Sequence, residues 1–333
     1  MGKNIFVFIE QRDGEIQKVS LELIGKAREL ADILEQSVVG ILAGHQIAAK
    51  AELLIAHGAD QVLLIDEPIL AEYITEPYAK AVTAVIEQYQ PEILLYGATA
   101  IGRDLAPRVA ARIHTGLTAD CTALSIDEET QNLLMTRPAF GGNIMATIVC
   151  ANHRPQMATV RPGVMKALPY DEKRSGVIEK LTISFNPADM NVKIREVVKE
   201  AKQSADITEA KVLVSGGRGI GGPEKLPMLK ELAEVLGGEL SCSRAIADAG
   251  WLERDRQVGQ TGKTVRPSLY FACGISGAIQ HVAGMESSDC IIAINKNNTA
   301  PIFDVADLGI VGDVNVIVPK LIEALKRYKE AKN

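Results

Sequence analysis

Short aliphatic segments that alternate with amphipathic ones constrain this chain more than any other sequence feature. In the N-terminal part, buried strands are expected at residues 5–9, 38–42, 61–65 and 93–96. Apolar residues at helical spacing predict the intervening helices, at 21–36, 47–57 and 73–90. Strands joined through helices make right-handed crossovers, so this order predicts a largely parallel sheet with helices on both faces.

The pattern changes near residue 117. There the segments become short and β-like, with turn residues between them, at 119–125, 133–138, 144–149 and 156–160. We interpret them as an antiparallel appendage on the parallel sheet. Two more apolar segments, 181–185 and 192–198, complete this part of the chain.

A polar, charged stretch (KEAKQSADITEA, 199–210) follows and is the best linker candidate in the chain. Beyond it the alternation resumes, with strands expected at 212–215, 269–273, 290–294 and 309–311. The accompanying helices are expected at 224–236, 277–284 and 319–329. A length of 333 residues fits two domains at about 150 residues each. We therefore predict an α/β fold with an N-terminal domain at 1–207 and a C-terminal domain at 208–333.

Composition excludes several classes of function. A net charge of -6 argues against binding to nucleic acid or to a membrane surface, which would favour a basic protein. The five cysteines form no CxxC pair, so neither a metal cluster nor a disulfide framework is expected, and reduced thiols indicate the cytoplasm. The first residues (MGKNIFVFIE) enter a strand without the apolar region of a secretory signal. No segment approaches the ~20 apolar residues that span a bilayer, so membrane insertion is not expected.

A glycine-rich turn follows the first strand of the C-terminal part, in the segment VLVSGGRGIGGPE. Such a strand–turn–helix junction offers backbone N–H groups to a phosphate, and Arg218 adds a guanidinium. Gly217, Gly219 and Gly222 match the GxGxxG fingerprint of NAD sites. Glu239 stands roughly where an acid would bind the ribose. Taken alone, this motif leaves open an NAD site and a tight turn with an exposed arginine.

Two further loops carry polar residues after expected strand ends. Ser243 and Arg244 follow one strand, and 259–262 form a polar loop. In the segment LYFACGISGAIQHVAGMESSDCIIAIN, Ser276 precedes a helix and His281 lies one turn into it. The carboxyl ends of parallel strands share one edge of a sheet, where such folds bind ligands. The three loops are therefore expected to converge on one cleft, although each of them alone is most often a solvated loop.

At these residues the chain resembles the alpha subunit of the electron transfer flavoproteins, over essentially its whole length. The segment GATAIGRDLAPRVAARIHTGLTADCTAL (97–124) is similar to the family's first domain, and 269–295 agrees with the family signature at nearly every fixed position. The resemblance implies that 208–333 is a Rossmann-like FAD-binding domain of the deoxyhypusine-synthase type. It also implies that 1–207 is a scaffold and the interface to a beta subunit. Residues expected to be structural or interfacial there are Arg103, Asp104 and Arg108.

The resemblance assigns roles in FAD binding to residues of the C-terminal domain. Near the pyrophosphate it places Arg218, Ser243 and Ser276. Around the isoalloxazine ring it places Arg244, Thr261 and His281, with the loop residues Val258, Gly259 and Gln260. Along the ribityl chain it places Gly277, Ala278, Ile279 and Gln280, and at the adenosine end Asn295, Asp313 and Val314. A cation at Arg244 and a hydrogen bond from His281, which would be stronger if the imidazole is protonated, would favour the anionic reduced flavin.

The resemblance implies an electron carrier rather than a substrate-transforming enzyme. The chain would pair with a beta subunit and accept electrons from an acyl-CoA dehydrogenase or another flavin dehydrogenase. Some family members bind a second FAD in the beta subunit and split electron pairs from NADH between a high-potential acceptor and ferredoxin. NADH and ferredoxin are therefore expected partners if this is a bifurcating member. An NAD-dependent oxidoreductase using the GxGxxG loop and a nucleotide-binding regulatory subunit remain as alternatives.

Overall fold

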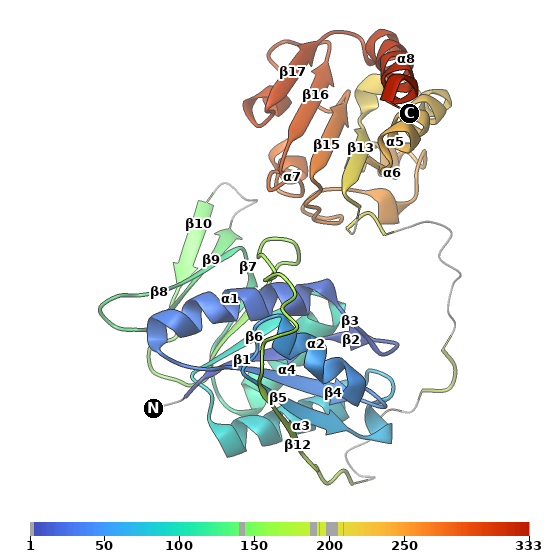
Figure 1. Cartoon of the computed structure of the whole chain (residues 1–333). Coiled ribbons are helices and arrows are strands. Elements are labelled where there is room, and N and C mark those ends of the chain that lie inside the picture. The colour runs from blue at the N-terminus through green and yellow to red at the C-terminus, as the bar shows by residue number, and fades with distance from the viewer. Residues whose placement is uncertain are drawn as a thin grey trace. The chain divides into compact units, whose positions relative to one another are not determined.

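The computed structural model describes residues 3–139, 144–186, 192, 194–197, 206–208 and 210–332. The chain divides into two compact units, Met1–Val198 and Lys199–Asn333 (Figure 1). Most of the linker expected at 199–210 lies outside the described residues. Ile207 is buried in the core of the second unit, so the end of that polar stretch packs as part of it. No helix of the described residues is long and apolar enough to cross a membrane.

Seven parallel strands form the main sheet among the described residues of the first unit, in the order β12-β5-β4-β1-β6-β11-β7. Their bounds are Ile5–Ile9 (β1), Val38–Gly44 (β4), Gln61–Asp66 (β5), Ile93–Gly97 (β6), Leu117–Cys121 (β7), Gln156–Val160 (β11) and Val177–Lys180 (β12). The parallel pairing confirms the prediction from the alternation of strands and helices.

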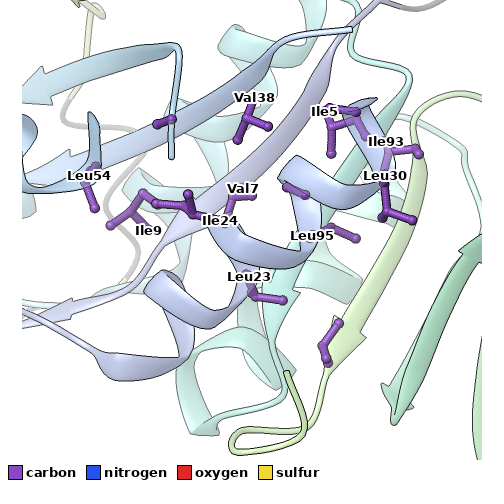
Figure 2. Packing of buried hydrophobic residues seen from close by; sticks show 14 of the residues in the cluster. Ile5, Val7, Ile9, Leu23, Ile24, Leu30, Val38, Leu54, Ile93 and Leu95 are labelled. Carbon is purple, nitrogen blue, oxygen red and sulfur yellow. The ribbon is translucent and has the colours of Figure 1, made fainter. Parts of the chain in front are cut away.

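Helices cover both faces of this sheet: Lys18–Leu34 (α1), Ala51–Ala56 (α2), Thr75–Tyr89 (α3) and Ala100–Arg112 (α4). On one face, Leu23 and Ile24 of α1 pack in one buried cluster with Val7 of β1 (Figure 2). On the other face, Phe6 and Phe8 of β1 lie in a second cluster with residues of α3 and α4. Because β1 is covered on both sides, all of its residues are buried, and it therefore reads as a continuous apolar run.

The segment 156–160 and the first part of 119–125, both expected in the antiparallel appendage, belong to the main sheet instead, as β11 and β7. β11 pairs in parallel with both β6 and β7, and all five of its residues are buried. A strand with both faces covered has this pattern, whereas a half-exposed antiparallel strand would alternate. The remaining segments do form an antiparallel sheet, with strands Ala123–Ile126 (β8), Leu133–Ala139 (β9) and Ile144–Ile148 (β10).

The end of the first unit differs from the expected pattern. β12, a strand of four residues, pairs with β5 at the edge of the sheet. The sequence does not predict this strand. The apolar segment 181–185 has no regular structure, although Leu181, Ile183 and Phe185 pack against the core. The apolar segment 192–198 lies partly outside the described residues, and 192 and 194–197 are irregular. Smaller elements are Gln11–Arg12 (β2), Glu15–Ile16 (β3), Ala48–Lys50 (η1) and Pro68–Leu70 (η2).

The described part of the second unit contains five parallel strands in the order β14-β13-β15-β16-β17, as its alternating pattern predicts. The strands are Val212–Gly216 (β13), Glu239–Cys242 (β14), Leu269–Cys273 (β15), Ile291–Asn295 (β16) and Leu308–Val311 (β17). The α-helices are Leu226–Leu236 (α5), Arg244–Asp248 (α6), Ile279–Val282 (α7) and Val314–Lys332 (α8). The 3-10 turns are Arg218–Ile220 (η5), Pro223–Lys225 (η6), Arg254–Arg256 (η7) and Pro301–Asp304 (η8).

Two helices of this unit differ in extent from the prediction. α7 is shorter than the expected 277–284, because the glycines on either side pack against other backbone segments. α8 begins at Val314 instead of the expected residue 319, and Pro319 lies inside the N-terminal part of the helix.

Candidate functional site

A cavity of about 970 Å³ opens at the carboxyl edge of the second unit's sheet. Its walls come from the segments that follow β13, β14, β15 and β16. From β13 the chain goes to β14 on one side and then to β15 on the other, so the strand order reverses between β13 and β15. Open α/β sheets bind ligands at such a reversal, and the volume suits a cofactor. The loops singled out in the sequence do converge on this cavity.

Most residues with a predicted role in cofactor binding line this cavity. They are Arg218, Ser243, Arg244, Val258, Gly259, Thr261, Ser276, Ala278, Gln280, His281 and Asn295. The lining residues that the structure describes do not include Gln260, Gly277, Ile279, Asp313 and Val314.

The residues outside the cavity wall have other contacts. Gly277 supports the wall, because a Cβ there would lie 2.5 Å from the Cα of Ile302. The Asp313 carboxylate accepts the Asn315 amide at 2.9 Å, at the start of α8, and pairs with Lys296 at 3.0 Å. Val314 is buried in the core.

The glycine-rich turn packs against the loop after β15. The amide of Gly217 donates to the Cys273 carbonyl at 2.8 Å, and that of Gly219 donates to the Gly274 carbonyl at 3.0 Å. A Cβ on Gly217 would lie 2.7 Å from the Cα of Ile275, and Gly274 itself has a φ of 63°. The glycines thus allow two loops to approach each other. The expectation that their backbone N–H groups cradle a phosphate is wrong for Gly217 and Gly219, whose N–H groups are already used.

Glu239 lies far from the position that an NAD site requires. It is the first residue of β14, at the amino end of the strand, whereas the cavity is at the carboxyl end. Its carboxylate accepts a hydrogen bond from the Arg256 guanidinium at 2.8 Å. A ribose-binding acid would follow the carboxyl end of that strand. Glu239 therefore does not complete an NAD site for the GxGxxG match.

An anion-binding group is present on the cavity wall. Arg218 is exposed, and its guanidinium forms no salt bridge with the described residues. The hydroxyls of Ser243 and Ser276 line the same cavity. The amide N–H groups of Ser276 and Gly277 donate to no backbone acceptor in the described part of the chain. A guanidinium, two hydroxyls and free amides are the donors that a phosphate group requires.

Arg244 is held on the cavity wall by a residue that the sequence interpretation overlooked. Its Nε donates to the Asp248 carboxylate at 3.0 Å, one turn along α6, and both side chains line the cavity. The four-residue spacing in a helical segment is the signal that would have identified Asp248. The pair gives the guanidinium a partner on the same wall, while its exposed fraction of 67% leaves it accessible.

The loop at 257–263 packs against α7 and the turn before it. The Gln260 amide donates to the Gln280 carbonyl at 2.6 Å, and Gly259, with a φ of 141°, fits closely against the same carbonyl. The Gln257 side chain donates to the Thr261 hydroxyl at 3.1 Å and so holds that hydroxyl at the cavity wall. Gln257 is a second lining residue that the sequence interpretation did not include.

His281 is buried on the cavity wall, with 7% of its surface exposed. Its Nδ1 lies 3.1 Å from the Val258 carbonyl oxygen and its Nε2 lies 2.9 Å from the Tyr270 hydroxyl. Burial lowers the pKa of His281 to about 4, although the bond to Val258 acts in the opposite direction. The imidazole is therefore neutral near pH 7. The imidazolium considered from the sequence is not its state here, and both ring nitrogens have partners within the protein.

The polar residues singled out in the first unit form ion pairs and hydrogen bonds. The Asp104 carboxylate accepts from the Tyr73 hydroxyl at 2.7 Å and from the Thr75 hydroxyl at 2.5 Å. Arg108 pairs with Glu76, and Arg103 lies 3.7 Å from Asp120. These contacts agree with a structural role.

The second unit therefore defines a class of protein, an α/β dinucleotide-binding protein whose cavity offers phosphate donors and a fixed arginine. Comparison with known families places it more narrowly. Residues 5–186 match the family described as "Electron transfer flavoprotein domain", and residues 206–286 match "Electron transfer flavoprotein FAD-binding domain".

Curated proteins similar to this chain agree with that placement. The electron transfer flavoprotein subunit alpha of Clostridium acetobutylicum is 57% identical over 326 residues, 97% of each chain. That of Thermoanaerobacterium thermosaccharolyticum is 56% identical over 327 residues, 98% of this chain and 99% of the relative. The acryloyl-CoA reductase electron transfer subunit beta of Anaerotignum propionicum is 47% identical over 356 residues, 99% of this chain and 97% of the relative.

The chain belongs to the electron transfer flavoprotein family, as an alpha subunit. The predicted cofactor, FAD, is confirmed by the match of the second unit to the family's FAD-binding domain. An alpha subunit also implies a beta subunit as partner.

Proposed function

We propose that this chain binds FAD in the cavity of its second unit and relays electrons between a flavin dehydrogenase and an acceptor, as half of a heterodimer with a beta subunit. The observation that carries the proposal is the group formed by Arg218, Ser243, Ser276 and the free amides after β15. These donors fit the pyrophosphate, and they lie in the segment that matches an FAD-binding domain.

The remaining predicted residues, some on the cavity wall and others beside it, would lie toward the two ends of the cofactor. Arg244 and Thr261 would lie at the isoalloxazine end, with Val258, Gly259 and Gln260 as the adjoining loop. Asn295, Asp313 and Val314 would lie at the adenosine end, and 277–280 along the ribityl chain. Bound FAD supplies the redox chemistry itself, so the chain contributes binding, orientation and charge. Arg244, aligned by Asp248, supplies the positive charge that favours added electrons.

The two units would have separate tasks. We propose that residues 208–333, together with Ile207 that packs in their core, form the FAD-binding domain and that the residues before them form the scaffold and the beta-subunit interface. Exposed apolar side chains on β10, among them Ile144, Met145 and Ile148, support an interface on the antiparallel sheet. All five cysteines are free, which supports a reducing compartment such as the cytoplasm.

The name of one relative bears on the redox partner. It is described as an electron transfer subunit of an acryloyl-CoA reductase, an enzyme that takes up electrons. This name supports an acyl-CoA-linked redox partner, and we propose an acyl-CoA dehydrogenase or another flavin dehydrogenase as the electron donor here. A bifurcating form would add NADH as donor and ferredoxin as acceptor, through a second FAD in the beta subunit.

The proposal is tested by copurifying the chain with its beta subunit and measuring the visible spectrum and the FAD content. Bound flavin should absorb at roughly 450 nm. One FAD per heterodimer would indicate a simple carrier, and two would indicate the bifurcating form. A colourless heterodimer that contains stoichiometric NAD would contradict the proposal and restore the NAD-dependent alternative.

A further inference from the structure

A short segment before β13 packs against the loop at 257–263, which contributes to the cavity wall. This segment, 206–208, lies within the second unit. Its middle residue, Ile207, is fully buried and packs in one cluster with Val258 and Val265, one near each end of the loop. The segment and the loop are far apart in sequence, so the fold of this unit brings them together.

An ion pair joins the same two parts of the chain. Nζ of Lys263 donates to Oδ1 of Asp206 at 2.9 Å, and the two side chains are only 29% and 31% exposed. The same oxygen accepts from the amide and the hydroxyl of Thr208, both at 3.0 Å. Burial raises the pKa of Asp206, but the bonds from Lys263 and Thr208 outweigh burial and keep the pKa below its usual value. The carboxylate is therefore charged near pH 7, and water screens the pair less than it screens a fully exposed one.

Lys263 also closes the loop through its backbone. Its amide donates to the Gln257 carbonyl at 2.8 Å, and its carbonyl accepts from the Gly259 amide at 3.1 Å. Four residues of this closed loop line the cavity: Gln257, Val258, Gly259 and Thr261. Lys263 is not itself among the lining residues that the structure describes. A side chain outside the cavity is thus linked to the position of part of the cavity wall.

We propose that Lys263 is a positioning residue for the cofactor site: Asp206 holds its ammonium group, and Lys263 holds the loop that places the Thr261 hydroxyl on the cavity wall. The inference rests on the proposed function, because the position of the loop matters to electron transfer only if the cavity holds FAD. The Gln257 side chain donates to the Thr261 hydroxyl from within the same loop, so a displacement of the loop also displaces this hydroxyl.

The first test is amide hydrogen exchange of the full chain without cofactor, measured by NMR. In Asp206→Asn a side-chain oxygen remains as an acceptor for Thr208, but the charge that holds Lys263 is lost. The amides of Gly259 and Lys263 close the loop, and they should exchange at least about threefold faster than in the parent. Exchange rates equal to those of the parent at both amides would overturn the proposal.

Lys326→Met is the matched control, because it removes another lysine–carboxylate pair of the second unit. Lys326 of α8 pairs with Glu231 of α5 at 2.7 Å, and neither residue lines the cavity. This variant should leave the exchange of the Gly259 and Lys263 amides unchanged. Acceleration of equal size in Asp206→Asn and in the control would show a general loss of stability and would overturn the assignment.

The second test measures FAD affinity in the heterodimer. Lys263→Met removes the ammonium group but keeps a side chain of similar length, and it should weaken FAD binding about three- to tenfold. Lys263→Arg keeps a cation that can pair with Asp206, so it should restore most of the affinity. Parental affinity in Lys263→Met, even with reduced stability, would show a merely structural pair and would overturn the positioning role.

The third test compares the midpoint potentials of bound FAD at saturating FAD. Lys263→Met and Asp206→Asn should both lower the potential, because both release the loop and so withdraw a hydroxyl that can donate to the flavin and favour added electrons. A direct effect of charge would instead shift the two potentials in opposite directions, since one variant loses a positive charge and the other a negative charge. Opposite shifts, or parental potentials in both variants, would overturn the proposal.

The two hypotheses fail separately. A heterodimer without FAD contradicts the proposed function, whereas hydrogen exchange of the chain alone tests whether the pair of Asp206 and Lys263 holds the loop.

Discussion

Replacing Gly217 with alanine should destabilise the second unit, because this glycine allows the turn after β13 to contact the loop after β15. The added Cβ would meet the Cα of Ile275 at 2.7 Å, closer than real Cβ contacts come, so the loops must separate. Overpacking of this kind typically costs about 1–3 kcal/mol. Separation also weakens the bonds from the Gly217 and Gly219 amides, each worth about 1 kcal/mol. We expect a loss of about 2–4 kcal/mol in the free energy of unfolding.

The assay is urea unfolding followed by tryptophan fluorescence. The chain has one tryptophan, Trp251, which packs against the core of the second unit and so reports on that unit. Gly222→Ala is the matched control: Gly222 has an extended backbone, and the atoms nearest its added Cβ belong to the flexible Glu224 carboxylate. If Gly217→Ala and Gly222→Ala have equal stabilities within about 0.5 kcal/mol, the reasoning from loop contact is refuted.

Three further outcomes follow from the site. Arg218→Ala should weaken FAD binding at least about tenfold, because a charge-assisted hydrogen bond to phosphate is worth about 1.5–3 kcal/mol. Lys230→Ala, on the exposed face of α5, is the control and should leave the affinity unchanged. FAD titration of the two variants measures both affinities. Glu239→Gln should alter neither FAD content nor the preference for FAD over NAD, and a gain or loss of NAD binding would contradict the structural role of Glu239. The pKa of His281 is 6.5 in the unfolded chain and about 4 in the folded one, so the unfolded chain binds the proton first as the pH falls. The free energy of unfolding should therefore decrease between these two pH values, by about 3 kcal/mol from this residue. Urea unfolding of His281→Gln should lack this pH-dependent contribution.

The sequence predicts most of the fold, because its periodicity reflects which strand faces are covered. β1 is buried throughout and reads as a strand between two layers. β11 has the same buried pattern, but it follows the three antiparallel strands β8, β9 and β10 along the chain, and proximity in sequence led to the wrong assignment. β12 gives no signal, because an exposed edge strand needs no apolar periodicity.

The site is less accessible to sequence reasoning than the fold. Arg218, Ser243 and Ser276 follow strand ends, and parallel topology brings such positions together whatever their separation in sequence. The contacts that fix the loop positions and the protonation state of His281 depend on tertiary packing instead. No local pattern shows that Gly217 faces Gly274, or that the imidazole of His281 meets Tyr270. The neutral His281 therefore became evident only from the structure.

The central claim is that the cavity of the second unit holds FAD, and the most direct measurement is the FAD content of a heterodimer whose cavity is blocked. Ala278 is an exposed residue of the cavity wall, and Ala71 is an exposed residue of the first unit. The account predicts that the Ala278→Trp heterodimer contains one FAD fewer than the parent, while the Ala71→Trp heterodimer keeps the parental content. An Ala278→Trp heterodimer with the full parental FAD content would contradict it.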